Sequence, residues 1–559
     1  MDRLVLRGAS FVPFALGSLG CLIMLASPAA WAGEVPVADV AGLLAAIAAA
    51  QPGDTIVLAP GNYEVKQSKI ACEAAGTADA PIVVQAAELG TVFIKFDAIE
   101  GFHVRGPHWE FANLDIQGVC AADSDCEHAF HVTGAADNTH LHHNRMHGFN
   151  AMIKGNGEPI GEGGSFVWPD DVTIEYNELF NEAPRDTSNP VTPVDVVGGH
   201  NWVVRGNFIH DHAKGGGDNV SYAAFLKGHS MDGLIERNLV VCELMHQGQV
   251  RLGLSLGGGG TGPNSICETG NCKPEHERGV IRNNLIVNCP ADVGVYVNAG
   301  ADTKIVNNTL YNTAGIDMRF PETTGVVHNN ILNGKIRDRD GGTSTKMNNL
   351  SEVGLGVLDG WFQDPGAYDF TLKDGAMLVD AGLALPEVPD DYCGNARDDG
   401  KNDIGAIEYD GDGCNGGVPV EGSGGETTDG TTGETTGNTT DATSGADTGN
   451  TSAASEGETS GITTGVSDGT GSDPSEASDP SGASDATNAS DPGSSSTPTS
   501  GDDPTTGAAT GVTDGTGTGG ASETGSQDEG GGCGCRSDAP GGAAGLLGLV
   551  LLGLRRRRG

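Results

Sequence analysis

The sequence repeats one β-type phrase around a single Asn. The clearest copies are VTIEYNELF (172–180), WVVRGNFIH (202–210), GLIERNLVV (233–241), GVIRNNLIV (279–287), TKIVNNTLY (303–311) and GVVHNNIL (325–332). In these copies apolar residues flank Asn177, Asn207, Asn238, Asn284, Asn308 and Asn330. The copies recur at intervals of about 20 to 45 residues, which is the period of solenoid proteins. A turn that recurs once per coil would stack these Asn side chains, each amide bonding to the next.

Two looser copies extend the pattern toward the N-terminus. They are THLHHNRMH around Asn144 and WEFANLDIQ around Asn113. Composition agrees with a β-solenoid, since the chain has 89 Gly among 559 residues and only 5% aromatic residues. Long amphipathic helical patterns are absent between Ala80 and Glu408. We therefore predict one all-β domain over residues 33–410 rather than several smaller domains.

The N-terminus is typical of an exported protein. Arg3 and Arg7 precede an apolar run from Phe11 to Ala26, and Ala30-Trp31-Ala32 supplies small residues for cleavage. This order predicts a secretory signal peptide over residues 1–32. A retained membrane anchor is the alternative.

Residues 411–532 have a different composition from the rest of the chain. They consist largely of Gly, Ser, Thr, Asp and Glu, and the segment carries much of the formal charge of −44. It cannot bury apolar surface, so we expect a disordered linker. The negative charge therefore describes this linker rather than a binding face, and an exported, strongly acidic chain argues against nucleic-acid binding.

The last segment, residues 533–559, combines Cys533 and Cys535 with a short apolar run and four Arg residues, Arg555 to Arg558. This order resembles the MYXO-CTERM sorting signal. The resemblance implies that a sorting protease processes a Cys at one of these positions and that the protein reaches the cell surface or outer membrane, with release outside the cell as a further outcome. Membrane contact is expected only through this segment, and an ordinary tail anchor is the alternative.

Nine Cys lie between the two ends. An exported chain normally oxidises its Cys residues, and an odd number leaves one unpaired. Cys242 and Cys289 follow Asn238 and Asn284 by four and five residues, so stacked coils would bring them together as the first disulfide candidate. Local pairs Cys120–Cys126, Cys267–Cys272 and Cys393–Cys414 are also expected. No paired C-x-x-C motif is present, so we expect no Cys-based metal site.

The segment AIAAAQPGDTIVLAPGNYEV (46–65) reads as a short Ala-rich helix, a Pro52-Gly53-Asp54 turn and a strand from Thr55 to Leu58. It resembles the N-terminal cap and first coil of the pectate-lyase-like superfamily of right-handed parallel β-helix proteins. The stretches Asp369–Gly382 and Asp403–Tyr409 resemble that superfamily's closing segment. The resemblance implies a right-handed parallel β-helix over most of residues 33–410. It does not imply one function, because the fold hosts lyases, hydrolases, epimerases and adhesins.

Strand alternation predicts a polar, net-basic strip on one outer face. The phrase AMIKG (151–155) copies AFLKG (224–228), which would place Lys154 and Lys227 in one column, and Leu226, Ile153 and Val196 are expected to point inward. The side chains expected to point outward, with His229 nearby, are Lys154, Asp195, Lys227, Arg251, Ser255, Asp317 and Arg319.

Glycan lyases of the resembled fold use a Lys or Arg to remove the proton next to a uronate carboxylate, which another cation or Ca²⁺ neutralises. By this resemblance Lys227, Arg251, Lys154 and His229 are the candidate catalytic residues, and Asp195, Asp317, Arg319 and Ser255 are candidate substrate-binding residues. A solvated ladder of surface ion pairs is the alternative interpretation. Acidic runs such as Asp398–Asp403 could hold Ca²⁺, although their spacing does not match an EF-hand loop.

Several His residues cluster between residues 128 and 147, and His147 and His210 each follow an Asn by three residues, which predicts that they stack. Local hydrogen bonding by turn His residues is the favoured interpretation, with zinc or copper binding as the alternative.

Two hypotheses for function remain open. The first is a surface protein that cleaves an acidic polysaccharide by β-elimination. The second is a non-catalytic surface protein that binds a glycan or supports adhesion. It is motivated by the absence of a lyase signature that groups Ca²⁺ ligands with a catalytic Arg.

Overall fold

A computed structural model of the chain describes residues 33–160, 165–262, 267–270 and 272–409. The predicted signal peptide, linker and C-terminal segment with Cys533 and Cys535 lie outside these residues, as does Cys414. The boundaries proposed for those segments therefore stay predictions.

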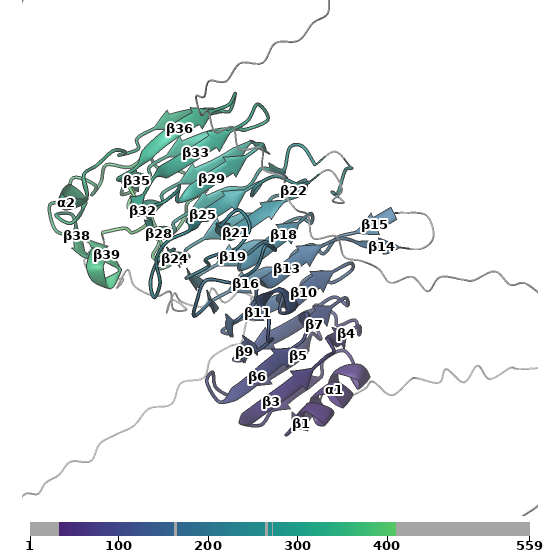
Figure 1. The fold of residues 1–559 in the computed structure, drawn as a ribbon. Coiled ribbons are helices and arrows are strands. Elements are labelled where there is room, and N and C mark those ends of the chain that lie inside the picture. Colours follow the sequence, from purple (N-terminus) through teal and green to yellow (C-terminus); the bar gives the residue numbers. More distant parts are fainter. Residues whose placement is uncertain (1–32, 161–164, 263–266, 271, 410–559) are drawn as a thin grey trace, which may run out of the picture. The chain divides into compact units, whose positions relative to one another are not determined.

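The described residues form three long parallel sheets, and Figure 1 shows their strands stacked one above another. Sheet 1 contains β1 (Glu34–Val37), β2 (Thr55–Leu58), β5 (Ile82–Ala86), β8 (Trp109–Ala112), β11 (His140–His142), β16 (Thr173–Glu175), β19 (Val203–Arg205), β23 (Leu234–Glu236), β27 (Val280–Arg282), β31 (Thr303–Val306), β34 (Thr324–His328) and β37 (Thr343–Met347).

Sheet 2 contains β4 (Ile70–Cys72), β7 (Glu100–Val104), β10 (His128–Thr133), β13 (Ala151–Asn156), β18 (Val194–Val197), β21 (Val220–Lys227), β25 (Val250–Leu256), β29 (Val295–Asn298), β33 (Gly315–Arg319) and β36 (Lys335–Arg339). Sheet 3 contains β3 (Gly61–Lys66), β6 (Val92–Asp97), β9 (Asp115–Gly118), β12 (Arg145–His147), β17 (Glu178–Phe180), β20 (Phe208–His210), β24 (Leu239–Val241), β28 (Leu285–Cys289), β32 (Thr309–Thr313) and β35 (Ile331–Leu332).

Each coil visits the three sheets in turn, as when β7, β8 and β9 are followed by β10 back in sheet 2. The domain is therefore a right-handed parallel β-helix, as the sequence predicts. Smaller elements interrupt the coils: β14 (Glu158–Ile160) with β15 (Ser165–Val167), β22 (Ser230–Met231) with β26 (His276–Glu277) and β30 (Gly300–Ala301), and the short helices η1 (Asp123–Asp125) and η2 (Pro365–Ala367).

Strand alternation builds the core. In β5, Ile82, Val84 and Ala86 point inward and are buried, while the intervening residues are half-buried. Successive coils stack like side chains on one another, and the rings of Phe102 and Phe130 lie 5.2 Å apart in β7 and β10. The predicted inward positions Ile153, Val196 and Leu226 are confirmed, because each side chain is buried.

The predicted Asn ladder is confirmed between sheets 1 and 3. The side-chain carbonyl of Asn238 accepts from the backbone N–H and the side-chain amide of Asn207, at 2.9 and 3.0 Å. The same pattern continues from Asn144 to Asn330 and adds Asn349, which the sequence pattern missed. Asn113 is not part of the ladder, because the backbone N–H of Leu114 takes that position and donates to Asn144.

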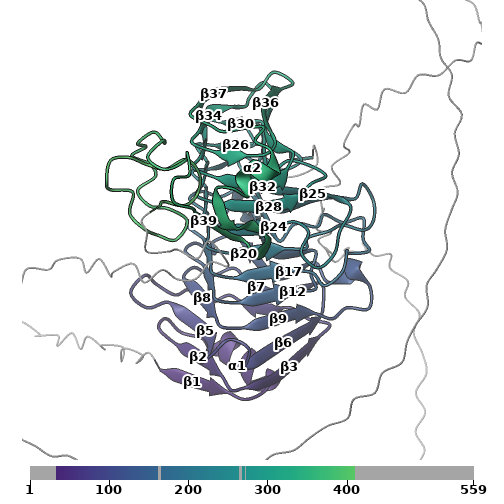
Figure 2. The same ribbon diagram turned by 90° about the vertical axis from the view of Figure 1, so that its left-hand side faces the viewer.

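Helix α1 (Val40–Ala49) caps the first coil, as expected. Asp39 accepts a hydrogen bond from the backbone N–H of Gly42 and so begins the helix. Leu43 and Ile47 are buried in the core at the first coil, and Figure 2 shows α1 at the lower end of the molecule, between β2 and β3. In the described part of the chain no helix is long and apolar enough to cross a membrane.

The C-terminal segment does not close the opposite end of the coils. Helix α2 (Leu355–Leu358), β38 (Phe362–Asp364) and β39 (Asp369–Leu372) pack beside sheet 3, and Phe370 and Ile407 join one apolar cluster with Leu239 and Leu285. The segment that the resemblance predicts to close the last coil therefore packs against the side of the β-helix instead. It buries apolar side chains that β24 and β28 direct outward.

Three predicted disulfides are confirmed: Cys242–Cys289, Cys120–Cys126 and Cys267–Cys272. The first joins adjacent coils with its Cα atoms 5.0 Å apart. Cys72 is the free cysteine of the described residues, and it is buried.

Candidate glycan-binding face

The outer face of sheet 2 carries a column of side chains in hydrogen-bonded register, which we name the outer column. It runs through His103, His131, Lys154, Asp195, Phe225, Ser255, Tyr296, Asp317 and Arg337. Neighbouring members are one strand spacing apart, about 4.8 Å.

Lys154 and Asp195 are brought together as predicted. The Lys154 ammonium lies 2.7 Å from Oδ1 of Asp195, and its side chain is 14% exposed. Burial alone would raise the pKa of Asp195, but Lys154 and Lys227 lower it below its ordinary range. This carboxylate therefore stays charged between two ammonium groups.

Lys227 is not in the same column as Lys154, contrary to the prediction. Its register partner is Val197, whereas that of Lys154 is Asp195, so Lys227 lies two residues further along its strand. The likeness of AMIKG to AFLKG is one of sequence and not of register. The Lys227 ammonium packs 4.5 Å from the Phe225 ring centre and donates to the backbone carbonyl of Gly260 at 3.2 Å.

The predicted strip is not continuous, because Phe225 and Tyr296 interrupt it and both are buried. The Gly-rich segment after Leu256 covers this part of the sheet. Ser255 is fully buried, and its hydroxyl accepts from the backbone N–H of Gly258 at 3.0 Å. Ser255 is therefore not placed to contact a substrate.

Arg251 is not brought to Lys227. It pairs in register with Ser221, six residues before Lys227 in β21, which is about 20 Å along the strand. Its side chain is 1% exposed. The guanidinium donates to the backbone carbonyls of Cys242 and Gly248. The predicted catalytic pairing of Lys227 with Arg251 is wrong on this geometry.

Asp317 and Arg319 lie at the other end of sheet 2. Asp317 is 1% exposed and accepts two hydrogen bonds from Arg337, at 2.6 and 3.0 Å. Arg319 donates to Asp340. Because β13 and β33 are five strands apart, these residues lie about 24 Å from Lys154.

His229 belongs to a turn rather than to the outer face. Its backbone has a positive φ of 66°. Its Nδ1 lies 2.6 Å from the Thr269 hydroxyl, and its Nε2 lies 3.2 Å from Glu277. Both ring nitrogens therefore face partners away from the Lys154–Asp195 pair.

His147 and His210 do not stack directly. Phe180 lies between them, with ring centres 5.0 Å from His147 and 4.7 Å from His210. They share a column but are two strands apart in sheet 3, because β17 intervenes.

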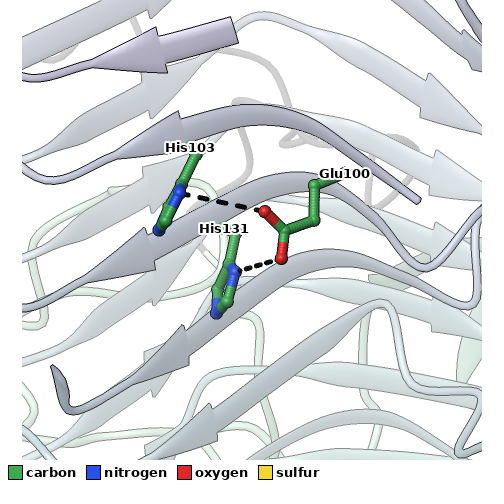
Figure 3. Close-up of side chains that lie close together, drawn as sticks. All are labelled: Glu100, His103 and His131. Carbon is green, nitrogen blue, oxygen red and sulfur yellow. Dashed lines mark hydrogen bonds and ion pairs between the residues drawn. The ribbon is translucent and has the colours of Figure 1, made fainter. Parts of the chain in front are cut away.

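Sequence reasoning missed the residues that begin the outer column. Glu100, at the start of β7, faces the Nδ1 atoms of His131 and His103 at 3.0 and 3.8 Å (Figure 3). Burial alone would raise the pKa of Glu100, but hydrogen bonds from His131 and Lys69 hold it below its ordinary range. The phrase FHV recurs at residues 102–104 and 130–132, and that 28-residue repeat is the signal that would have found both His residues.

The hairpin β14–β15 brings one more carboxylate to this region. Glu158 accepts from the Thr133 hydroxyl at 2.8 Å and from Arg105 at 2.8 Å. Its contact with His103 is the main cause that lowers the pKa of Glu158 to about 2. The N-terminal half of the outer column is thus a dense, half-buried set of paired charges.

Neither of the two groups of clustered His and Glu side chains in the described residues has the ligand set of a Ca²⁺ site. Ca²⁺ takes roughly six to eight oxygen ligands. The groups of three donors in the described ranges are Glu100–His103–His131 and Glu110–His140–His142, and each offers two nitrogens. In the acidic run 398–403, the Asp403 carboxylate accepts instead from the backbone N–H groups of Asp380 and Tyr409.

Comparisons with known proteins give likenesses over part of the chain. The family model for chondroitinase B matches residues 37–152, a range that includes Glu100, His103 and His131 and ends before Lys154. Pectate lyase L of Dickeya chrysanthemi is 31% identical over 164 residues, which cover 26% of this chain and 35% of the relative. The chain thus spans about a third of the length of the curated relative it matches.

Two solved structures are similar to this chain in fold. Pectate lyase Pel9A has a TM-score of 0.41 at 16% identity, over 65% of this chain and 90% of that one. A rhamnogalacturonan lyase has a TM-score of 0.40 at 14% identity, over 60% of this chain and 90% of that one. At these scores neither bears on substrate or mechanism. The described domain is a right-handed parallel β-helix whose residues 37–152 match the chondroitinase B family model, and part of the chain is similar in sequence to pectate lyase L.

Proposed function

We propose that the domain acts on an acidic polysaccharide at the N-terminal half of the outer column and cleaves it by β-elimination. The observation that carries the proposal is the Lys154–Asp195–Lys227 arrangement on the outer face of sheet 2. The partial likeness to chondroitinase B and pectate lyase L supports a uronic-acid polymer as the substrate class.

Lys154 and Lys227 have different roles in this proposal. Lys154 lies 2.7 Å from Asp195 and, as a cation, suits neutralising a uronate carboxylate. Lys227 would first lose its own proton to solvent and then remove the proton next to that carboxylate. The C–H and glycosidic C–O bonds break, a C=C bond forms in the ring, and the leaving oxygen receives a proton.

Ultraviolet absorbance of the unsaturated uronate tests this proposal on the full chain. Polygalacturonate, alginate and chondroitin sulfate are the substrates, each with Ca²⁺ and with chelator. We expect turnover in the wild type and a loss of at least about a hundredfold in K227M and K154M. The control K335M makes the same change at an exposed Lys of sheet 2 and should keep full activity.

Turnover that survives unchanged in K227M would contradict the assigned base. Circular dichroism shows whether K154M is folded. If it is not, the activity of K227M alone tests the proposal. The second candidate function is glycan binding without cleavage. It is favoured by the burial of Arg251 and by its distance from Lys227, which remove the predicted catalytic pair. Binding without any turnover of the panel would select it.

We also propose that the protein is exported and displayed at the cell surface, on the strength of the predicted signal peptide and the Cys533/Cys535 segment. Replacing both Cys residues with Ala should abolish processing and surface display. Unchanged display, measured by antibody labelling of intact cells, would contradict it.

A further inference from the structure

The hydrogen bonds around Glu100, His103 and His131 show which nitrogen of each His ring carries a proton. The His131 Nε2 faces Oδ1 of Asn156 at 2.7 Å, and the Asn156 amide donates to the Gly157 carbonyl at 3.0 Å. This second bond fixes the orientation of the Asn156 amide, so its oxygen faces the ring. The Nε2 of His131 must therefore carry a proton.

The same argument applies to His103. Its Nε2 lies 2.9 Å from the Thr133 hydroxyl, which itself donates to Glu158 at 2.8 Å. Since Thr133 uses its proton on Glu158, it accepts from His103. Each imidazole is thus a proton donor through Nε2, and each directs its Nδ1 toward the carboxylate of Glu100, as Figure 3 shows.

Nδ1 of His131 lies 3.0 Å from Glu100, so either that nitrogen carries a proton or a cation lies between the two groups. Nδ1 of His103 lies 3.8 Å from Glu100, which is too long for a hydrogen bond and leaves that nitrogen open to a metal. The rings stack with centres 5.0 Å apart and planes 14° apart, and both are nearly buried. A neutral ring with its proton on Nε2 presents a lone pair at Nδ1, which is the form in which His binds a metal.

We propose that Glu100, His103 and His131 form a binding site for a first-row divalent transition metal, with Zn²⁺ as the probe. The three donor atoms lie within 4.8 Å of one another. Zinc bonds to His nitrogen and carboxylate oxygen are about 2.0 to 2.2 Å long, so a modest closure of His103 completes the set. Two nitrogens and one oxygen suit such a metal rather than Ca²⁺.

The surroundings of the site have the features of a second coordination shell. Asn156 and Thr133 hold the outer nitrogen of each His, which fixes the ring and its tautomer. Lys69 contacts Glu100 at 2.9 Å, but its side chain is 45% exposed and can turn into solvent when a divalent ion takes its place. Three protein ligands leave a position for water or a substrate oxygen.

The second group of donors is a weaker candidate and serves as the comparison. His140 directs its Nε2 at Glu175 rather than at Glu110. The Nδ1 atoms of His142 and His143 lie 2.9 Å apart, and either can be the donor, so this contact does not fix the tautomer of His142. Its side chains are also more exposed, with His140 at 34%.

Metal binding to the full chain tests the site without reference to activity. After treatment with chelator, the protein is titrated with Zn²⁺ by calorimetry and with Co²⁺ by visible absorption, which reports ligand geometry. We expect one tight equivalent in the wild type, a loss of affinity of at least about tenfold in H131Q and E100Q, and a similar loss in N156A through the second shell. H140Q should retain the tight equivalent.

No tight equivalent in the wild type would overturn the proposal. So would wild-type affinity in a folded H131Q or E100Q protein, or an equal loss in H140Q. If H131Q does not fold, E100Q still tests the proposal, because Gln is close to isosteric with Glu. The site is independent of the glycan proposal, because metal binding is measured without a substrate.

Discussion

At the residue scale, contacts from neighbouring strands shift the pKa values of single side chains on the coils. His147 in β12 lies between Asp115 of β9, at 3.2 Å, and Glu182, which follows β17. Burial alone would lower the pKa of His147, but its hydrogen bonds to Asp115 and Glu182 raise it to about 9. The ring also stacks on Phe180, so the charged form is held in place on three sides.

This shift predicts a pH-dependent contribution to stability. The folded-state pKa lies above the ordinary value of 6.5, so the contribution is complete below pH 6.5 and is lost as pH rises toward about 9. Because Glu182 is half exposed, we expect a contribution of about 1 to 2 kcal/mol. The free energy of unfolding of H147Q should be lower than that of the wild type below pH 6.5, and this difference should shrink as the pH rises toward about 9. A deficit that does not change with pH would contradict the assignment.

Residue types were easier to predict than residue partners. Strand alternation placed Lys154 and Asp195 correctly on the outer face. It could not place Lys154 relative to Lys227, because that column was predicted from the likeness of AMIKG to AFLKG, and the likeness does not set the register between β13 and β21. Arg251 has the outward parity that alternation requires, but the turn from Cys242 to Gly248 covers it, and burial by a turn is not encoded in alternation.

At the element scale, the turn between sheets 1 and 3 specifies how coils stack. Each ladder Asn, other than those at the two ends, donates its amide to both neighbouring coils, and its carbonyl accepts from the Asn of the preceding coil. Asn238, for example, donates to Val204 at 2.9 Å and to Asn284 at 3.0 Å. These bonds satisfy buried backbone groups that a turn would otherwise leave without partners.

The Asn238→Ala variant should therefore lose about 2 to 4 kcal/mol of unfolding free energy, since it leaves several buried groups without partners. Asn113→Ala is the matched control, because Asn113 lies outside the ladder and makes one hydrogen bond of 3.3 Å. We expect a cost of about 1 kcal/mol there, mainly from the positive φ of that residue. Denaturant unfolding followed by circular dichroism measures both, and equal costs would argue against the ladder as a source of stability.

At the scale of the β-helix domain, sheet 2 has two regions with a cover between them. The first contains the Lys154–Asp195 pair with Glu100, His103 and His131, and the second contains Asp317 with Arg319 and Arg337. The segment after Leu256 lies between them. Asn298 donates to the Gly258 carbonyl, and Glu275 accepts from the Thr261 backbone.

This division predicts that one half of sheet 2 binds a glycan. R319M should leave affinity for an acidic glycan unchanged within about twofold, because Arg319 is already paired with Asp340 and lies about 24 Å from Lys154. K227M should weaken binding in the same assay. Fluorescence titration of the full chain measures both affinities. A loss in R319M comparable to that in K227M would show that the glycan occupies the whole face.

The sequence by itself determined the coil architecture, the ladder and the pairing of Cys242 with Cys289, because each follows from a short repeated pattern. A period-2 alternation chooses the buried face, and one Asn per coil chooses the turn. Only the tertiary structure decided which side chains meet on the outer face. The segment after Leu256 covers part of that face, and the Glu100–His103–His131 group is set by coil register and not by proximity along the chain.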